Sequence, residues 1–242
     1  MISIILLQCL KDGGKRMKKT LFRKMTALLL AVITTLCFVG CAKEFDASAY
    51  MKAELDLLTK HDLEQYMDVI GVSETEAMEI YEESMSGITA SLEDLRTAGL
   101  PEDLISEYEL WMIDLIVNTK YTVLEASKDG DAYIVPVEVE PVRAFANVSE
   151  SLETQLSAYM EDLIADMMAG GAQPSEEEMN LWVYQTLLDI VKANLDNPQY
   201  GEKQTFNITI EKNSDGLYEP NEEQTMELGM NLLDLSDIED LM

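Results

Sequence analysis

The spacing of apolar residues changes several times along this chain. Residues 25–40 form an almost unbroken apolar run. In residues 46–118 and 149–197 the apolar positions recur every three to four residues, which is typical of helices that bury one face. In residues 120–142 and 204–219 apolar and polar positions alternate instead, which is typical of strands. The pattern predicts a hydrophobic leader followed by an α+β domain.

The first helical stretch contains four predicted helices. They are a helix that begins after Asp46, followed by residues 62–70, 74–98 and 101–118. The third helix has a clear start, because Ser73 and Glu76 have the spacing of a capping box. Gly71 and Gly99 end the second and third helices, since glycine readily adopts the left-handed conformation found at helix C-termini. Pro101 suits the first turn of the fourth helix.

The first alternating segment is predicted to be a β-hairpin. Strands at residues 120–125 and 133–142 flank a turn at residues 128–131, which contains the Asp-Gly pair typical of tight turns. The second strand places valines and a tyrosine on one side and mainly acidic residues on the other. Pro136 and Pro141 predict that this strand lies at a sheet edge or is bulged, because proline cannot donate a ladder hydrogen bond.

The second part of the chain repeats the order of helices and hairpin. Another capping box at Ser175 opens the second of two long helices, which ends before Pro198. The predicted elements are helices at residues 149–168 and 175–197, strands at 204–210 and 217–219, a last helix at 221–233, and an acidic tail at 236–242.

This order predicts an internal duplication of a helix-helix-hairpin unit, with halves at residues 46–145 and 149–235. Each half carries a Leu-Trp pair, at Trp111 and Trp182, and an Asp-Gly turn. Two copies with unequal spacing also arise by chance, so both explanations stay open. In either case the expected fold class is α+β. A single domain, residues 46–235, contains one antiparallel sheet built from two hairpins, with helices packed on its apolar face.

Residues 17–40 have the layout of an export signal peptide. Lys18, Lys19, Arg23 and Lys24 form a cationic start in front of the apolar run. As a helix the run rises about 24 Å, whereas a spanning helix crosses a hydrocarbon core of roughly 30 Å. A signal peptide is therefore favoured over a permanent transmembrane anchor.

Residues 38–41, Phe-Val-Gly-Cys, resemble the lipobox of bacterial lipoproteins, in which a small residue precedes the cysteine that becomes the mature N-terminus. The resemblance implies a diacylglyceryl thioether on Cys41, although Phe38 departs from the usual leucine. Cys37 is a poorer candidate, because a bulky leucine precedes it. Two acyl chains anchor a protein stably, so we expect a lipid tether with residues 41–45 as its linker.

Residues 1–16 fit poorly in front of a signal that has its own methionine and basic start. Gly13 and Gly14 can be encoded by a ribosome-binding sequence two codons upstream of Met17. We therefore expect translation to start at Met17. A precursor peptide containing residues 2–10 would contradict this expectation.

Removal of residues 1–40 makes the chain far more acidic. Of 17 Lys and Arg residues seven precede Cys41, but of 46 Asp and Glu residues only Asp12 does. The remainder carries ten basic and 45 acidic side chains, a net charge of −35. This charge argues against nucleic acid and against a surface lying on anionic lipid, and it favours cations and basic partners. Once Cys41 is modified, no cysteine is left for a disulfide or a thiolate metal site.

Several segments besides the lipobox resemble a family of uncharacterised lipoproteins of Gram-positive bacteria. They are residues 45–50, Tyr66, residues 73–77 and 81–83, and the Asp-Gly-x-x-Tyr hairpin. The resemblance spans most of the mature chain, and its motifs look structural. It implies a surface lipoprotein of unknown function on the outer side of the cell membrane, and it supplies no catalytic residue.

Few residues point to catalysis. His61 is the only histidine, and it lies between two predicted helices, where a solvated linker residue is expected. The sequence therefore contains no Ser-His-Asp, Cys-His or His-based zinc set. Dinucleotide and P-loop signatures are absent as well. Carboxylate pairs are so abundant that only geometry could single one out. We predict no catalytic residue, no metal ligand and no cofactor.

Two further features admit more than one interpretation. Residues 211–222 have the ligand spacing of an EF-hand calcium loop with Gly216 at its sixth position, but they follow a strand, so a polar hairpin turn is favoured. Four aromatic residues could line a ligand pocket, but their helical spacing favours a place in the core. They are Tyr108, Trp111, Trp182 and Tyr184.

The sequence favours a binding function. We expect a lipid-anchored extracytoplasmic protein that binds a protein or small ligand and is not an enzyme. One alternative is a carboxylate-dependent enzyme, with or without a divalent cation, on a cell-envelope substrate. The other is a structural envelope factor. An apolar pocket would favour binding of a small ligand. Two carboxylates about 5–10 Å apart would favour glycan hydrolysis, and an exposed apolar patch would favour a partner protein.

Overall fold

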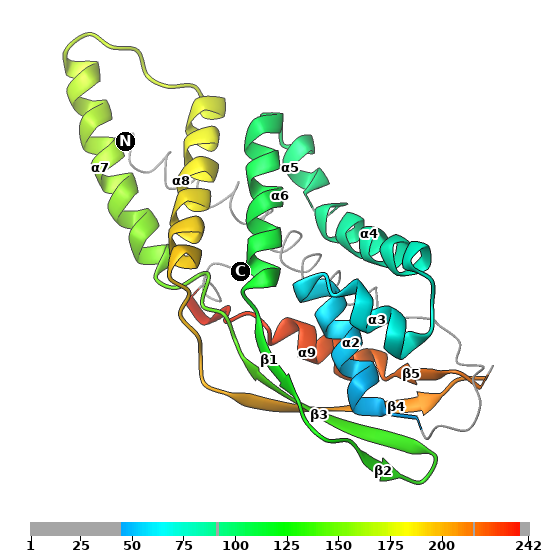
Figure 1. The fold of residues 1–242 in the computed structure, drawn as a ribbon. Helices are drawn as coiled ribbons and strands as arrows, with labels where there is room; N and C mark the ends of the chain where they lie inside the picture. The colour runs from blue at the N-terminus through cyan, green and yellow to red at the C-terminus, as the bar shows by residue number, and fades with distance from the viewer. Residues whose placement is uncertain (1–44, 91, 215, 238–242) are drawn as a thin grey trace.

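The computed structural model describes residues 45–90, 92–214 and 216–237 (Figure 1). The predicted signal peptide, Cys41 and the end of the acidic tail lie outside these residues. Within them, helices cover one face of a single antiparallel sheet, which confirms the α+β fold class.

The helices of the first stretch are α2 (Ala47–Lys60), α3 (Leu63–Ile70), α4 (Glu74–Ala90), α5 (Glu93–Thr97) and α6 (Glu102–Val117). Asp46 caps α2 as predicted, since its carboxylate accepts a hydrogen bond from the backbone N–H of Ala49 at 2.9 Å. The single helix predicted at residues 74–98 is wrong. The helix is interrupted between α4 and α5, and Leu92 and Leu95, which follow the interruption, are both buried in the core.

The two predicted hairpins form and pair with each other. The strands are β1 (Lys120–Val123), β2 (Ser127–Asp129), β3 (Ala132–Glu140), β4 (Gln204–Lys212) and β5 (Tyr218–Pro220). Their order is β1-β3-β4-β5, and β2 also pairs with β3, next to β1. Gly130 adopts φ 62° in the turn between β2 and β3, a left-handed conformation that glycine takes without strain.

The prediction that Pro136 places its strand at an edge is wrong, because β3 lies inside the sheet between β1 and β4. The Pro136 carbonyl accepts a hydrogen bond from the backbone N–H of Leu124 at 2.9 Å, so its nitrogen also faces the β1–β2 side. There residues 124–126 interrupt the ladder between β1 and β2. The bulge that proline requires is therefore in the neighbouring strand.

The buried side chains form two clusters. One joins the inner face of β3 and β4 to α2, α3 and α9 (Glu222–Met230). Tyr133, Val135, Val137 and Val139 are all buried there, as the alternation predicts. The second cluster lies between α5, α6, α8 and the segment 142–148. Figure 1 shows α2 and α9 lying over the sheet, with α6 rising from its edge. The single domain expected for residues 46–235 stays a prediction.

The remaining helices are α7 (Val148–Met168) and α8 (Glu176–Asp196), close to their predicted bounds. The Ser175 capping box forms, with the Glu178 side chain and the Ser175 hydroxyl each bonded to the other residue's backbone N–H. The loop between α7 and α8 lies at the end of the molecule opposite the sheet (Figure 1). The internal duplication stays a prediction, because both halves run from helix to hairpin but differ in helix number.

Candidate interaction surface

The α7–α8 hairpin is joined to the rest of the protein at one end. Both helices are 21 residues long, which corresponds to about 30 Å each. In α7 only Val148 is buried, and in α8 burial begins at Thr186. From residue 149 to residue 185 no side chain is buried. The outer part of this hairpin therefore has no core beneath it.

The two helices are held together by a narrow seam. The rings of Tyr159 and Trp182 stack with centroids 4.4 Å apart and an interplanar angle of 21°. Half-buried apolar residues of α7 share the face of Tyr159 by their helical spacing. They are Leu152, Leu156, Leu163 and Met167. Through this seam α7 packs against α8.

A second row of apolar side chains runs along α7 beside the seam. Met160, Ile164 and Met168 recur four residues apart and so lie on one line along the helix. Ile164 is 53% exposed and Met168 is 85% exposed. Together with the seam, this row widens the apolar arc of outer α7 to about 180°, whereas a helix packed on one neighbour needs about 100°. We call Met160, Ile164 and Met168 the α7 stripe.

The hairpin is also strongly acidic. Residues 144–191 contain no lysine, arginine or histidine. The same segment contains nine carboxylates: Glu150, Glu153, Glu161, Asp162, Asp166, Glu176, Glu177, Glu178 and Asp189. The exposed apolar stripe therefore lies in a negative field with no local cation to offset it.

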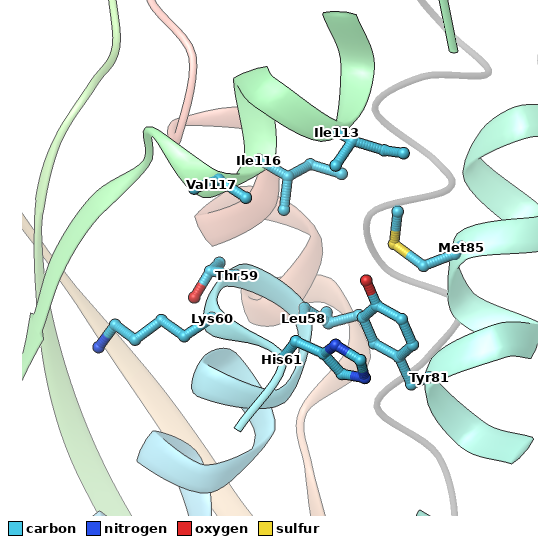
Figure 2. A pocket seen from close by; sticks show the side chains of 9 residues that line it. All are labelled: Leu58, Thr59, Lys60, His61, Tyr81, Met85, Ile113, Ile116 and Val117. Atoms are coloured by element: carbon cyan, nitrogen blue, oxygen red, sulfur yellow. The ribbon is translucent and has the colours of Figure 1, made fainter. Parts of the chain in front are cut away.

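The described residues also form a small apolar cleft next to His61, between α2, α4 and α6 (Figure 2). His61 ends α2 in the left-handed conformation, with φ 54°, and its ring stacks on Tyr81 at 4.1 Å. The side chain is exposed, as predicted for a linker residue. The cleft has a volume of about 130 Å³, well below the roughly 300 Å³ at which ligand pockets begin.

A larger polar cleft of about 300 Å³ lies at the outer face of β1 and β3. Three lysines line it, but each already has a partner. Lys60 pairs with Asp56 at 2.6 Å, Lys203 pairs with Glu138 at 2.8 Å, and the Lys120 ammonium lies 3.5 Å from the centre of the Tyr200 ring. These pairings leave little free positive charge for an anion.

Two buried carboxyl groups escaped the sequence analysis because the chain has so many acidic residues. Burial raises the pKa of Glu54 to about 8, against weaker hydrogen bonds from Tyr50 and Tyr66 that lower it. Asp56 accepts hydrogen bonds from Lys52, Lys60 and Tyr121. Neither carboxyl group lines either of these two clefts, so we assign both a structural role.

The aromatic residues singled out in the sequence lie in two different places. Tyr108 and Trp111 are buried in the second cluster, and Tyr184 packs against it, so these three belong to the core. Trp182 does not, because it stacks on Tyr159 in the hairpin. Sequence reasoning also missed the α7 stripe. Only the width of the apolar arc on a helical projection of α7 could have revealed it.

Residues 211–222 form the end of β4, a turn, β5 and the first residue of α9, so no helix precedes the proposed calcium loop. The amide of Asn213 donates a hydrogen bond to Glu219 at 2.6 Å, which uses two of the supposed ligands. Asp215 lies outside the described residues. Among the residues that the structure does describe, no three His, Cys, Asp or Glu side chains are placed to share a metal ion.

Among residues 45–90, 92–214 and 216–237, no helix is both long and apolar enough to span a bilayer. The fold and its surface define an α+β protein that carries a projecting, acidic helical hairpin. No protein-family model matches the sequence, and no curated protein is significantly similar to it. One solved structure is similar, that of a candidate lipoprotein, ycdA, from Bacillus subtilis subsp. subtilis str. 168. Its sequence is 16% identical, the TM-score is 0.47, and the match covers 78% of this chain and 56% of that chain. The present chain thus corresponds to little more than half of ycdA.

Proposed function

We propose that this protein is a lipid-anchored, extracytoplasmic interaction protein that uses the α7–α8 hairpin to bind another protein. The observation that carries the proposal is the α7 stripe, whose Ile164 and Met168 are exposed on a helix that already has its packing partner. Exposed apolar surface of this kind is costly unless a partner covers it.

The residues that line the two clefts favour a binding protein over an enzyme. The cleft beside His61 is small, and the lysines of the polar cleft are paired. The carboxyl groups that are buried, Glu54 and Asp56, are held by hydrogen bonds within the described core. Glu138 and Glu140 both line the polar cleft, but Glu138 pairs with Lys203 at 2.8 Å, so the two do not form a free acid/base pair.

Anchoring by a lipid on Cys41 is supported by the lipobox resemblance and by the short run of residues 25–40. Membrane fractionation of the producing cells tests this part of the proposal. Wild-type protein should be in the membrane fraction. In mass spectrometry, the N-terminal peptide of the wild type should carry the mass of the lipid, and that of Cys41→Ser should not. An unmodified N-terminal peptide in the wild type would overturn the lipid anchor.

Site-specific photo-crosslinking in the same cells tests the interaction. A benzophenone amino acid is placed at Ile164, and at Leu110 of α6 as the control, since Leu110 is also exposed, at 64%. We expect a discrete protein adduct from position 164 and none from position 110. Equal adducts from both positions, or none from either, would contradict an interaction through the hairpin.

A further inference from the structure

Carboxylates lie on α7 beside the α7 stripe and between the stripe and the base of the helix. Glu150, Glu153 and Glu161 project from the same side of α7 as Met160 and Ile164, by the helical repeat. All three glutamates are exposed. The outer side of α7 thus presents the α7 stripe with Glu161 beside it and Glu150 and Glu153 nearer the base, over roughly 27 Å.

A second copy of this chain fits that surface poorly. Residues 144–191 of each copy carry nine carboxylates and no cation, so two hairpins would bring like charges together. An anionic membrane is disfavoured for the same reason. What complements the surface is a partner with apolar side chains on one line and cations beside them.

Resting on the proposed interaction function, we propose that the α7 stripe docks a basic amphipathic helix of a partner protein. Leu-like side chains of that helix pack between Met160, Ile164 and Met168, and the flexible thioethers of the two methionines adapt to different shapes. Its lysines or arginines pair with Glu150, Glu153 and Glu161. This is helix-in-groove recognition, in which a third helix completes the packing of a two-helix hairpin.

Fluorescence anisotropy with a labelled 18-residue probe peptide tests the proposal. The probe has leucine at helical spacing and lysine at all other positions, and the intact lipid-anchored chain is held in nanodiscs of zwitterionic lipid. We expect saturable binding that weakens at least tenfold between low salt and 0.3 M salt. Ile164→Asn with Met168→Asn should weaken binding at least tenfold. The matched control, Leu110→Asn with Val117→Asn, should change it less than twofold, since Leu110 and Val117 are exposed on α6.

A second pair of variants isolates the charges. Glu150→Gln, Glu153→Gln and Glu161→Gln together should weaken binding at least tenfold and flatten its salt dependence. Glu79→Gln, Glu82→Gln and Glu83→Gln make the same charge change on exposed positions of α4 and should have less than a twofold effect.

Several outcomes would overturn the inference. Equal losses in target and control variants would show binding to net charge alone. A probe in which glutamate replaces lysine must not bind, and sedimentation at neutral pH must not show self-association through the stripe. If position 164 crosslinks a protein in cells but the lysine probe does not bind, the interaction function stands and the basic helix is excluded. If neither result is obtained, both proposals fall.

Discussion

At the scale of single residues, Glu54 is unusual because its carboxyl group is buried. It lies in the cluster between the sheet and α2, and burial holds its pKa at about 8. Its hydrogen-bond partners, Tyr50 and Tyr66, are themselves buried, and burial raises the pKa of each above its ordinary value. Glu54 is therefore largely protonated at pH 7 and acts as a neutral hydrogen-bonding group.

The raised pKa makes the stability depend on pH in a defined direction. Between the ordinary value of 4.5 and about 8 the folded state binds the proton that the unfolded state has lost. The free energy of unfolding should therefore fall as pH rises through this window. Glu54→Gln imitates the protonated acid, so it should match the wild type at pH 4.5. At pH 9 it should be more stable by a few kcal/mol, since one unit of pKa is worth about 1.4 kcal/mol.

Urea unfolding at several pH values measures this difference. Glu64→Gln on α3 is the control, because Glu64 is exposed. If Glu54→Gln destabilised the protein equally at every pH, the carboxyl group would not be neutral in the folded state.

Asp56 shows the opposite behaviour two residues away. Burial alone raises its pKa, but hydrogen bonds from Lys52, Lys60 and Tyr121 outweigh burial and lower it below 3.8. Its side chain is only 2% exposed. Asp56→Asn should therefore cost about 2 kcal/mol at pH 7, because it weakens the charge-assisted hydrogen bonds from Lys52 and Lys60 within α2 and from Tyr121 of β1.

This cost should shrink as pH falls through the folded pKa of Asp56, since the wild type then loses the same charge. Thermal unfolding at pH 7 and pH 3 measures both values. Asp68→Asn on α3 provides a control, because Asp68 is exposed. A cost that did not change with pH would show that the ionised form of Asp56 is unimportant.

At the scale of elements, the sequence predicted most helices and both hairpins because their signals are local. The capping box at Ser175 and the turn at Gly130 are each decided by a few neighbouring residues. Pro136 was misplaced because its meaning depends on a partner strand. Only the register of β1 and β2 shows that the gap opposite Pro136 lets a proline lie inside the sheet.

The candidate surface was harder to predict than the fold. Periodicity shows that Ile164 and Met168 are on an apolar face of α7, but it does not show what covers that face. Trp111 and Trp182 have the same Leu-Trp context, yet Trp111 is in the core and Trp182 in the hairpin. The difference between the two tryptophans comes from tertiary packing, which is not a local property of the sequence.

The tip of the hairpin should depend on its capping box more than a supported helix does. Ser175→Ala removes the hydroxyl that accepts a hydrogen bond from the Glu178 backbone, at a cost of about 1 kcal/mol. Because no core lies beneath this end, the loss should appear as about fivefold faster amide exchange in residues 176–180, with global stability changed little.

Ser73→Ala at the start of α4 is the matched control, since Ser73 and Glu76 make the same reciprocal hydrogen bonds. There Ala77 is buried just after the box, so exchange should rise less. Equal effects at both sites would argue that the α8 tip is packed more firmly than its exposure indicates.

At the scale of the whole molecule, the start of the described chain lies far from the hairpin tip. The Phe45 ring stacks on Tyr218 at 3.8 Å and contacts Tyr133 at 5.4 Å, so it is fixed against β3 and β5. Figure 1 places the first turn of α2 beside the strands and the α7–α8 loop at the opposite end. A lipid on Cys41, four residues before Phe45, would hold the sheet within about 14 Å of the membrane.

The expected result is that the hairpin points away from the bilayer. A donor fluorophore at Met168 should transfer little energy to an acceptor lipid, because roughly 40 Å or more of helix and sheet separate it from the anchor. A donor in the β2–β3 turn at Asp131 should transfer much more. Phe45→Ala removes the ring that fixes the linker, so the two efficiencies should become more alike while the fold, checked by circular dichroism, is kept. Equal transfer from both positions in the wild type would show that the tether does not orient the molecule, and that the α7 stripe is not presented to partners beyond the membrane surface.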